Sequence, residues 1–242
     1  MRSRVYIADV NELEDPELYD FLYWVVPEKR REKIGKRQDP AEKRRSLAAG
    51  ALLMYAAKRE GIPCETAEDR FGKPFFTKAS DVYFSLSHSG NYAVCLIGGS
   101  KAGCDTQRYS TGRLSVAARF FAKEECKYIF SRHGSERRER AFFRIWTMKE
   151  SFVKAHGEGL RLPLSSFSVI PERSGARMVY QGMPYRFFEY KKLPNHALSI
   201  CVEAGAGCEK PEWIITDFRK LKTEIGGHHE NRSEDRHVDT DV

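Results

Sequence analysis

A pattern that occurs twice along the 242-residue chain restricts its possible folds more than any other feature. A helical pattern over residues 40–60 ends at a glycine and leads through short strands to an apolar, cysteine-containing strand at 92–97. A second helical pattern, over about 136–156, also ends at a glycine and leads to a similar apolar strand at 197–202. Two such runs also arise by chance. If the repeat is real, it predicts an α+β fold of two similar subdomains with a ligand site between them.

The expected elements follow from hydrophobic periodicity. In the first long helix, Leu47, Ala48, Ala51, Leu52 and Tyr55 recur at three-to-four spacing. The other expected helices cover residues 16–35, with a break at Pro27, and 115–131. The other expected strands cover 4–9 (of edge type), the segment after the turn at 72–76, 82–87, 102–107, 167–170, 177–180 and 185–190.

The last twenty residues, 223–242, differ in composition from the rest of the chain. They are polar, carry alternating charges and contain a single isoleucine. Such a segment cannot bury enough apolar area to offset its ordering entropy, so we predict a disordered polar tail. A metal-binding role for its three histidines is the less favoured interpretation.

Bulk composition predicts a globular, intracellular protein. Hydrophobic residues make up 41% of the chain, and no apolar run approaches the roughly 20 residues that span a bilayer. Asp9 interrupts the N-terminal apolar stretch too early for a signal peptide. The six cysteines form no CxxC pair, which favours reduced thiols and a cytoplasmic location.

The chain is basic, with a net charge of +7. Basic residues cluster in 29–45 and 132–144, where the simplest interpretation is a solvated helix face. A positive surface otherwise favours nucleic acid, a membrane, an anionic small molecule or an acidic protein as partner, and composition does not choose among them.

Two short segments carry the side chains best suited to phosphate chemistry. In an extended segment, Asp105 and Gln107 point to the same face, and on a helix Glu150 and Lys154 lie one turn apart. Mg²⁺ is typically held by one or two carboxylates together with substrate phosphates, and the lysine would bind a phosphate oxygen. The structural alternative is an ordinary helix-surface Glu–Lys pair and an aspartate that caps a turn.

The segment 85–90 (Ser-Leu-Ser-His-Ser-Gly) is the third candidate. Its hydroxyls and His88 offer several donors to an anion, whereas the alternative is a polar hairpin turn. The chain contains neither a Gly-x-Ser-x-Gly elbow nor a Walker-type loop, so hydrolase and P-loop interpretations lack support.

Taken in order, these segments resemble the Sfp-type 4′-phosphopantetheinyl transferases over roughly residues 5 to 205. The most specific match is the string Trp-Thr-Met-Lys-Glu-Ser-Phe-Val-Lys at 146–154, combined with Ser-His-Ser at 87–89. The other matching stretches are 27–30, 45–47, 72–74, 84–86, 103–105, 120–125 and 159–168.

The resemblance implies two pseudo-symmetric α/β subdomains of the 4′-phosphopantetheinyl transferase fold, with the active site in the cleft between them. Residues 1–102 would bind coenzyme A, and residues 103–222 would supply the metal and phosphate site. The implied protein is a monomer. It would transfer 4′-phosphopantetheine from coenzyme A to a serine of an apo acyl or peptidyl carrier protein and release 3′,5′-ADP, with Mg²⁺ or Mn²⁺ as the metal.

The resemblance also implies roles for single residues. Asp105 and Glu150 would be metal ligands assisted by Gln107, and Lys154 would contact the pyrophosphate. Coenzyme A phosphates would meet Ser87 and His88, with the adenine near Ser46. The nucleotide end would meet a basic set: Lys29, Lys33, Arg45 and Lys73.

Glu125 matches an acidic position near the metal in that family. Either Glu150 or a water held by Glu125 would then accept the proton of the carrier serine. One departure from the family concerns Gln107, because many members carry glutamate there, and the lost negative charge should weaken metal binding.

Two other functions compete with the transferase. A non-catalytic module would hold coenzyme A or a carrier without transfer, with Gln107 marking a degenerate site. A nucleic-acid binder is suggested only by the basic charge, and no nucleic-acid motif stands out. We therefore expect no nucleic-acid and no membrane partner. The sequence leaves open whether the carrier serves fatty acid, polyketide or nonribosomal peptide synthesis.

Overall fold

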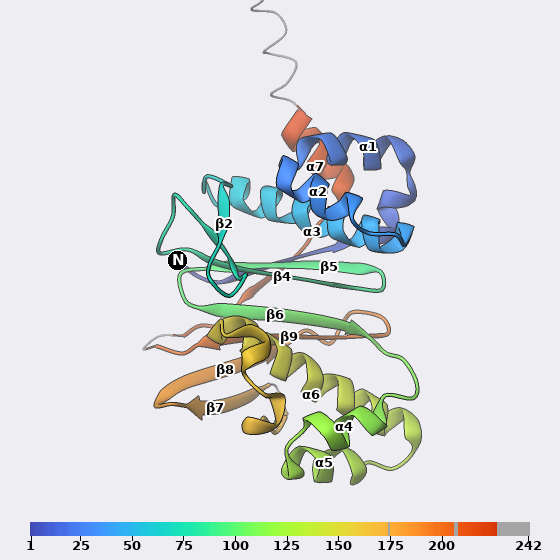
Figure 1. The fold of residues 1–242 in the computed structure, drawn as a ribbon, viewed down its shortest axis with the longest axis vertical. Helices are drawn as coiled ribbons and strands as arrows, with labels where there is room; N and C mark the ends of the chain where they lie inside the picture. The colour runs from blue at the N-terminus through green and yellow to red at the C-terminus, as the bar shows by residue number, and fades with distance from the viewer. Residues whose placement is uncertain (174, 206–207, 227–242) are drawn as a thin grey trace, which may run out of the picture.

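The computed structural model describes residues 1–173, 175–205 and 208–226 of the chain. Two four-stranded sheets form its centre (Figure 1). The first has the order β10-β1-β5-β4, in which β1 and β10 run parallel and the other pairs are antiparallel. Its strands are β1 (Arg4–Asp9), β4 (Tyr83–Ser89), β5 (Tyr92–Gly98) and β10 (Glu212–Ile215).

The second sheet is antiparallel throughout and has the order β6-β9-β8-β7. Its strands are β6 (Ala102–Arg108), β7 (Ala176–Tyr180), β8 (Met183–Glu189) and β9 (His196–Glu203). The two sheets face each other across one apolar cluster, to which Val5 and Leu96 contribute from the first sheet and Ile200 from the second. Because alternate residues of β1 point the opposite way, Tyr6 packs toward the helices instead.

Helices cover the outer face of each sheet (Figure 1). Over the first sheet lie α1 (Pro16–Val25), α2 (Glu28–Gly35), α3 (Pro40–Arg59) and α7 (Phe218–Gly226). Over the second lie α4 (Leu114–Phe120), α5 (Lys123–Phe130) and α6 (Ser135–His156). Short elements complete the fold: η1 (Val10–Glu14), β2 (Thr66–Glu68), β3 (Pro74–Phe76), η2 (Gly159–Arg161) and η3 (Leu164–Ser166).

The predicted α+β class is confirmed, and the sequence pattern explains the two long helices. The Asp39 side chain accepts the N–H of Ala41 at the start of α3, and Leu47 and Leu52 on its inner face are fully buried. Helix α6 ends at Gly157, whose φ of 98° closes the helix in the left-handed conformation. The predicted break at Pro27 separates α1 from α2.

Three local predictions were wrong. Strand β1 is not at an edge, because β10 pairs with it from the far end of the chain. The helix predicted over 115–131 is two helices, α4 and α5, with Phe121 extended between them. Residues 167–170, all of them described, form no strand, since the N–H of Val169 donates to a side chain instead of a strand neighbour.

The end of the described chain returns to the first sheet. Strand β10 joins β1, and α7 packs on α1 and α3, although the sequence placed residues up to 222 with the second half. Of the predicted tail, residues 223–226 belong to α7, and residues 227–242 lie outside the described residues. The pseudo-symmetry and the boundary at residue 102 stay predictions. Among the described helices, none is long and apolar enough to cross a bilayer.

Candidate active site

A glycine lets helix α6 pack directly against strand β6. An ideal Cβ on Gly103 would lie 2.1 Å from the carbonyl oxygen of Ser151 and 2.5 Å from the nitrogen of Ala155. Any side chain at this position would therefore push the helix away from the strand. The close approach brings the last turns of α6 over β6, which carries Asp105 two residues further on.

Asp105 and Lys154 form the central ion pair of this contact. The Lys154 Nζ lies 2.7 Å from Asp105 Oδ1, and it also donates to the carbonyl oxygens of Cys104 at 3.0 Å and Leu86 at 3.5 Å. Burial is the largest single influence on the pKa of Lys154 and lowers it, but the charge and hydrogen bond of Asp105, together with Cys104 and Glu150, more than offset burial, so the net shift is upward. The lysine is thus held as a cation that joins β4, β6 and α6.

Two further donors fix the Asp105 carboxylate, which is 3% exposed. The Ser87 hydroxyl lies 2.9 Å from Oδ1, and the Gln107 Nε2 donates to Oδ2 at 3.2 Å. The predicted shared face of Asp105 and Gln107 is therefore present in the structure. Since Gln107 uses its amide nitrogen on the aspartate, its carbonyl oxygen is the atom left for another partner.

Glu150 lies one helical turn before Lys154 and faces a cavity. None of the ion pairs among the described residues includes it. Burial raises the pKa of Glu150, the negative charge of Asp105 raises it further, and Lys154 opposes the shift. A proton or a bound cation would each stabilise a carboxylate in this environment, because either one offsets its buried negative charge.

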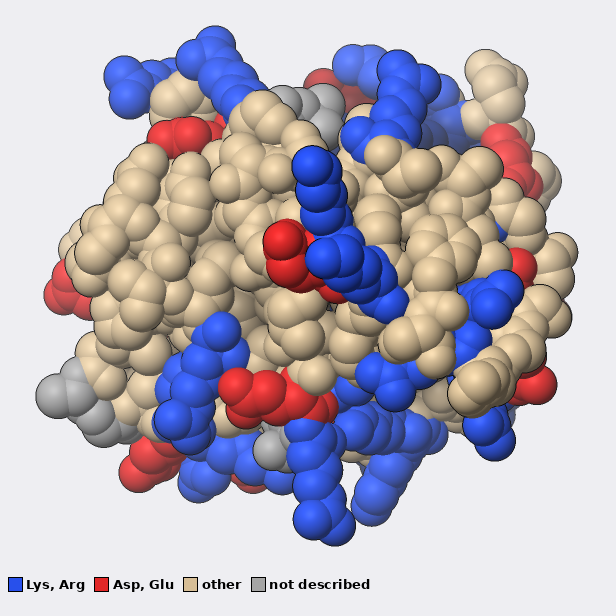
Figure 2. All heavy atoms as spheres, turned by 90° about the horizontal axis from the view of Figure 1, so that it is seen from below, with Lys and Arg blue, Asp and Glu red and all other residues tan. Residues whose placement is uncertain are grey.

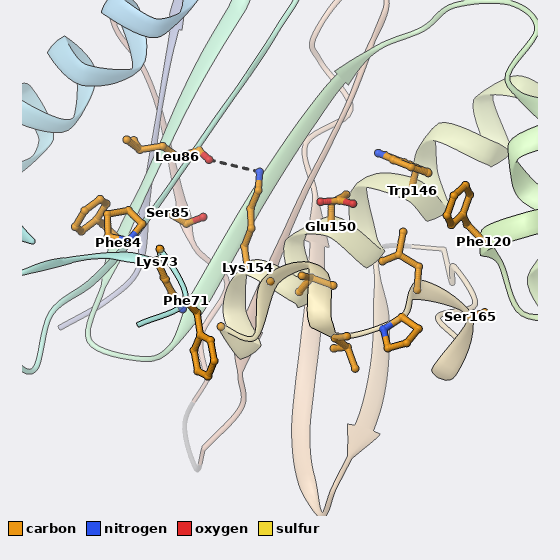
Figure 3. Close-up of a pocket in the computed structure, with 18 of the residues that line it drawn as sticks. Phe71, Lys73, Phe84, Ser85, Leu86, Phe120, Trp146, Glu150, Lys154 and Ser165 are labelled. Carbon is orange, nitrogen blue, oxygen red and sulfur yellow. Dashed lines mark hydrogen bonds between the residues drawn. The ribbon is translucent and has the colours of Figure 1, made fainter. Parts of the chain in front are cut away.

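The cavity has a volume of about 820 Å³. In Figure 3, Phe71 and Lys73 lie toward one end, Trp146 and Phe120 toward the other, and Lys154 and Glu150 between them. The remaining lining residues are Gly72, Pro74, Phe84, Ser85, Leu86, Arg119, Val153, Gly157, Gly159, Leu162, Pro163, Leu164 and Ser165. A largely apolar chamber with a few charged groups at its wall suits a ligand that is long, mostly neutral and anionic at one part.

His88 lies near the end of β4, directly after Ser87, which binds Asp105. Its Nδ1 is buried and has no hydrogen-bond partner among the described residues. Burial lowers the pKa of His88; Glu42 opposes this effect, whereas Lys154 and Arg45 act with burial. The imidazole is therefore neutral near pH 7 and keeps one nitrogen free for a ligand.

The structure does not bring all the predicted basic residues to the cavity. Lys73 lines it and donates to the Ala155 carbonyl oxygen at 3.1 Å. Arg45 on α3 pairs with Glu42 at 2.6 Å, and Lys33 on α2 pairs with Glu68. Lys29 is exposed on α2, and Ser46 is buried on α3 at 4% exposure.

Glu125 is in a different environment from the one predicted. It has no exposed surface and forms an ion pair of 2.6 Å with Lys149, which is equally buried. Its carboxylate also accepts the backbone N–H groups of Ala122 and Val169. Glu125 does not line the cavity, and all of these contacts are structural.

Sequence reasoning missed several groups that shape the site. The aromatic side chains of Phe71, Phe120 and Trp146 give no local signal of a shared cavity, because they come from three distant segments. Arg30 is partly buried and packs against α3, where a Cβ on Gly50 would lie 2.8 Å from its Cγ. A glycine in the middle of an otherwise good helix was the available clue to that contact.

The donor set is compatible with a hard divalent cation. Within the described residues, no group of three His, Cys, Asp or Glu side chains could hold a metal ion. Asp105 and Glu150, however, are two carboxylates near enough for one to raise the pKa of the other, with the Gln107 amide beside them. Two carboxylates and a neutral oxygen fit a Mg²⁺-type site that substrate oxygens complete.

Comparison with known proteins gives the family. A sequence model of the 4′-phosphopantetheinyl transferase superfamily matches residues 101–201, which include Asp105, Glu150 and Lys154. The 4′-phosphopantetheinyl transferase Sfp of Bacillus subtilis (strain 168) is 30% identical over 198 residues, which span 78% of this chain and 87% of the relative.

Two further relatives agree. The 4′-phosphopantetheinyl transferase psf-1 of Bacillus pumilus is 32% identical and covers 72% of this chain and 76% of the relative. The 4′-phosphopantetheinyl transferase gsp of Aneurinibacillus migulanus is 27% identical over 83% and 86% of the two chains. On the residues of the site and on these likenesses together, the chain belongs to the 4′-phosphopantetheinyl transferase superfamily and is an enzyme of that family.

Proposed function

We propose that this protein transfers the 4′-phosphopantetheine group of coenzyme A to a serine hydroxyl of an apo acyl or peptidyl carrier protein and releases 3′,5′-ADP. The observation that carries the proposal is the Asp105–Lys154 ion pair beside the Glu150 carboxylate, which lies at the cavity wall and joins no ion pair among the described residues. This combination offers a cation and a metal-ligand pair to a pyrophosphate, and an apolar chamber to the pantetheine arm.

Asp105 and Glu150 would hold the divalent ion, with the carbonyl oxygen of Gln107 as a neutral third donor. We propose Mg²⁺, with Mn²⁺ as a substitute, because all three donors are hard oxygen atoms. When bound, the ion supplies positive charge that stabilises the pyrophosphate as its bond breaks.

The residues of the chain would bind and orient the reactants. Lys154 Nζ binds a non-bridging oxygen of the pyrophosphate, exchanging for it the contact to the Leu86 carbonyl oxygen, the longest of its three bonds at 3.5 Å (Figure 3). The carrier serine oxygen forms a bond to phosphorus while the bond from phosphorus to the 3′,5′-ADP oxygen breaks. We propose that Glu150 takes the hydroxyl proton.

Coenzyme A would bind mainly through residues 1–102. His88 supports this proposal, because its buried Nδ1 lacks a partner among the described residues. Lys73 contributes an ammonium group at the cavity wall. Lys29, Lys33, Arg45 and Ser46 would serve the nucleotide end. Lys33 and Arg45 would first exchange their present pairs with Glu68 and Glu42.

The carrier would dock as an acidic helix on a basic surface of this protein, which we propose acts as a monomer. Figure 2 looks onto the end of the molecule where α4 and α5 lie. Lys and Arg side chains gather along two opposite margins of this face and also lie at its centre, where acidic side chains are beside them. Exposed basic residues of these elements and the start of α6 include Arg113, Arg119, Lys123, Lys127, Arg132, Arg137 and Arg140. Opposite charge would raise the rate of encounter more than the affinity.

Intact-mass measurement of an apo carrier incubated with this protein, coenzyme A and Mg²⁺ tests the proposal. We expect the carrier to gain one phosphopantetheine, and Glu150→Ala or a chelator to abolish the gain. Glu136→Ala is the matched control, because Glu136 is an exposed glutamate of the same helix paired to Arg140. No gain on several carriers with either Mg²⁺ or Mn²⁺, despite coenzyme A binding, would favour the non-catalytic module.

A further inference from the structure

Serine hydroxyls join the two sheets where their edge strands meet. On β4, three alternate residues point toward β6, and each side-chain oxygen accepts one backbone N–H from an alternate residue of that strand. The bonds run from Cys104 to Ser85 at 3.0 Å, from Thr106 to Ser87 at 3.1 Å and from Arg108 to Ser89 at 3.0 Å. This serine ladder replaces the carbonyl partners that a paired strand would supply.

The middle rung of the ladder makes one contact that the outer rungs lack. The Ser87 hydroxyl donates to Asp105 Oδ1 at 2.9 Å while its oxygen accepts the Thr106 N–H. A hydroxyl has a single proton, so Ser87 cannot donate to a phosphate while this bond exists. Ser85 and Ser87 are equally buried, at 6% exposure, but only Ser85 lines the cavity.

We propose that Ser87 is a positioning residue for Asp105 rather than a coenzyme A contact, an inference that rests on the proposed function for its metal. Asp105 Oδ1 receives two donors, Ser87 and Lys154, which occupy its acceptor capacity. Oδ2 receives only the longer bond from Gln107. The hydroxyl therefore fixes the rotation of the carboxylate so that Oδ2 is the oxygen available to a cation.

Metal titration separates this role from the ladder. Ser87→Ala and Ser89→Ala each remove one rung of the ladder, but only Ser87→Ala also removes a hydrogen bond to Asp105. Mn²⁺ is the probe, and electron paramagnetic resonance measures the free ion in the presence of coenzyme A. We expect S87A to bind Mn²⁺ about tenfold more weakly than the unchanged protein. S89A should stay within about twofold of the unchanged protein, and Ser87→Thr, which keeps the hydroxyl, should restore affinity. Equal affinities for S87A and S89A would overturn the inference.

A second measurement needs no metal. In urea unfolding, the effects of S87A and Asp105→Ala should be non-additive because the two residues are in contact, whereas S89A and D105A should add. Additivity in both cycles would also overturn the inference. If S87A does not fold, Ser87→Cys takes its place, since a thiol keeps the volume and donates only weakly. Unchanged protein that neither binds Mn²⁺ nor modifies a carrier would refute the proposed function, and the unfolding cycle would still decide the role of Ser87.

Discussion

Glu125 and Lys149 form an ion pair of 2.6 Å in which neither side chain has any exposed surface. The pair joins three segments, because Lys149 also donates to the Phe167 carbonyl oxygen at 2.7 Å and Glu125 accepts the N–H of Val169. Lys149 immediately precedes Glu150, and the segment just before Phe167 lines the cavity. The buried pair therefore sets the position of the cavity wall.

Removing one charge of this pair should destabilise the protein severely. Lys149→Met leaves the Glu125 carboxylate buried and uncompensated, for which we expect a loss of about 3–5 kcal/mol in the free energy of unfolding. Glu125→Gln combined with K149M removes both charges and should recover part of that loss. Urea unfolding of the three proteins measures this, and a double variant less stable than K149M would contradict it.

Gly103→Ala should loosen the contact that creates the site. The new methyl group would lie against the backbone of α6, at 2.1 Å from the Ser151 carbonyl oxygen, so helix or strand must shift. Overpacking of this kind costs about 1–3 kcal/mol or more, and we expect transfer to fall further than stability because Asp105 and Lys154 separate. Gly35→Ala is the control, because a Cβ there meets nothing within 4 Å. Normal transfer by G103A would refute this account of the contact.

Structural features that neighbouring residues determine could be predicted from the sequence, whereas contacts between distant elements mostly could not. The three-to-four spacing in α3 and the alternation that puts Asp105 and Gln107 on one face are set by neighbouring residues, and both predictions hold. The contact of Asp105 with Lys154 needed a second element, and the signal for it was Gly103, whose missing side chain admits the helix.

Other features arise from residues far apart in the chain. No pattern near Arg4–Asp9 shows that β10, some 200 residues later, pairs with it and turns an expected edge strand into an inner one. Likewise, the resemblance placed Glu125 near the metal, and only the fold shows that it is buried against Lys149. Burial of charge requires a partner from another element, which periodicity cannot identify.

Gln107→Glu should strengthen metal binding. The added carboxylate raises the negative charge of the ligand set next to Asp105, and metal affinity rises with ligand charge. We expect the Mg²⁺ concentration that gives half-maximal transfer to fall by about tenfold, and Gln107→Ala to raise it modestly. A titration of the transfer rate with Mg²⁺ measures both effects. Tighter binding by Q107A than by Q107E would show that position 107 does not face the ion.

Glu150→Gln should stabilise the metal-free protein at neutral pH while abolishing transfer. Burial and then Asp105 raise the pKa of Glu150 above its ordinary 4.5, so the folded protein holds this proton more tightly than the unfolded chain does. The contribution of Glu150 to stability is therefore fully present below about pH 4.5 and is lost as pH rises through the folded-state pKa. E150Q lacks this loss, so its advantage in melting temperature over the unchanged protein should grow with pH across that interval and then stay constant.

Thermal unfolding between pH 4 and 8 in a chelator measures this difference. Glu136→Gln removes an exposed charge from the same helix and should change the melting temperature little at any of these pH values. Saturating Mg²⁺ with coenzyme A should reverse the order, because only the carboxylate of the unchanged protein gains a cation. If metal-free E150Q is the less stable protein at pH 7.5, Glu150 is stabilised by its surroundings at neutral pH, and its assignment as a metal ligand and proton acceptor loses its physical basis.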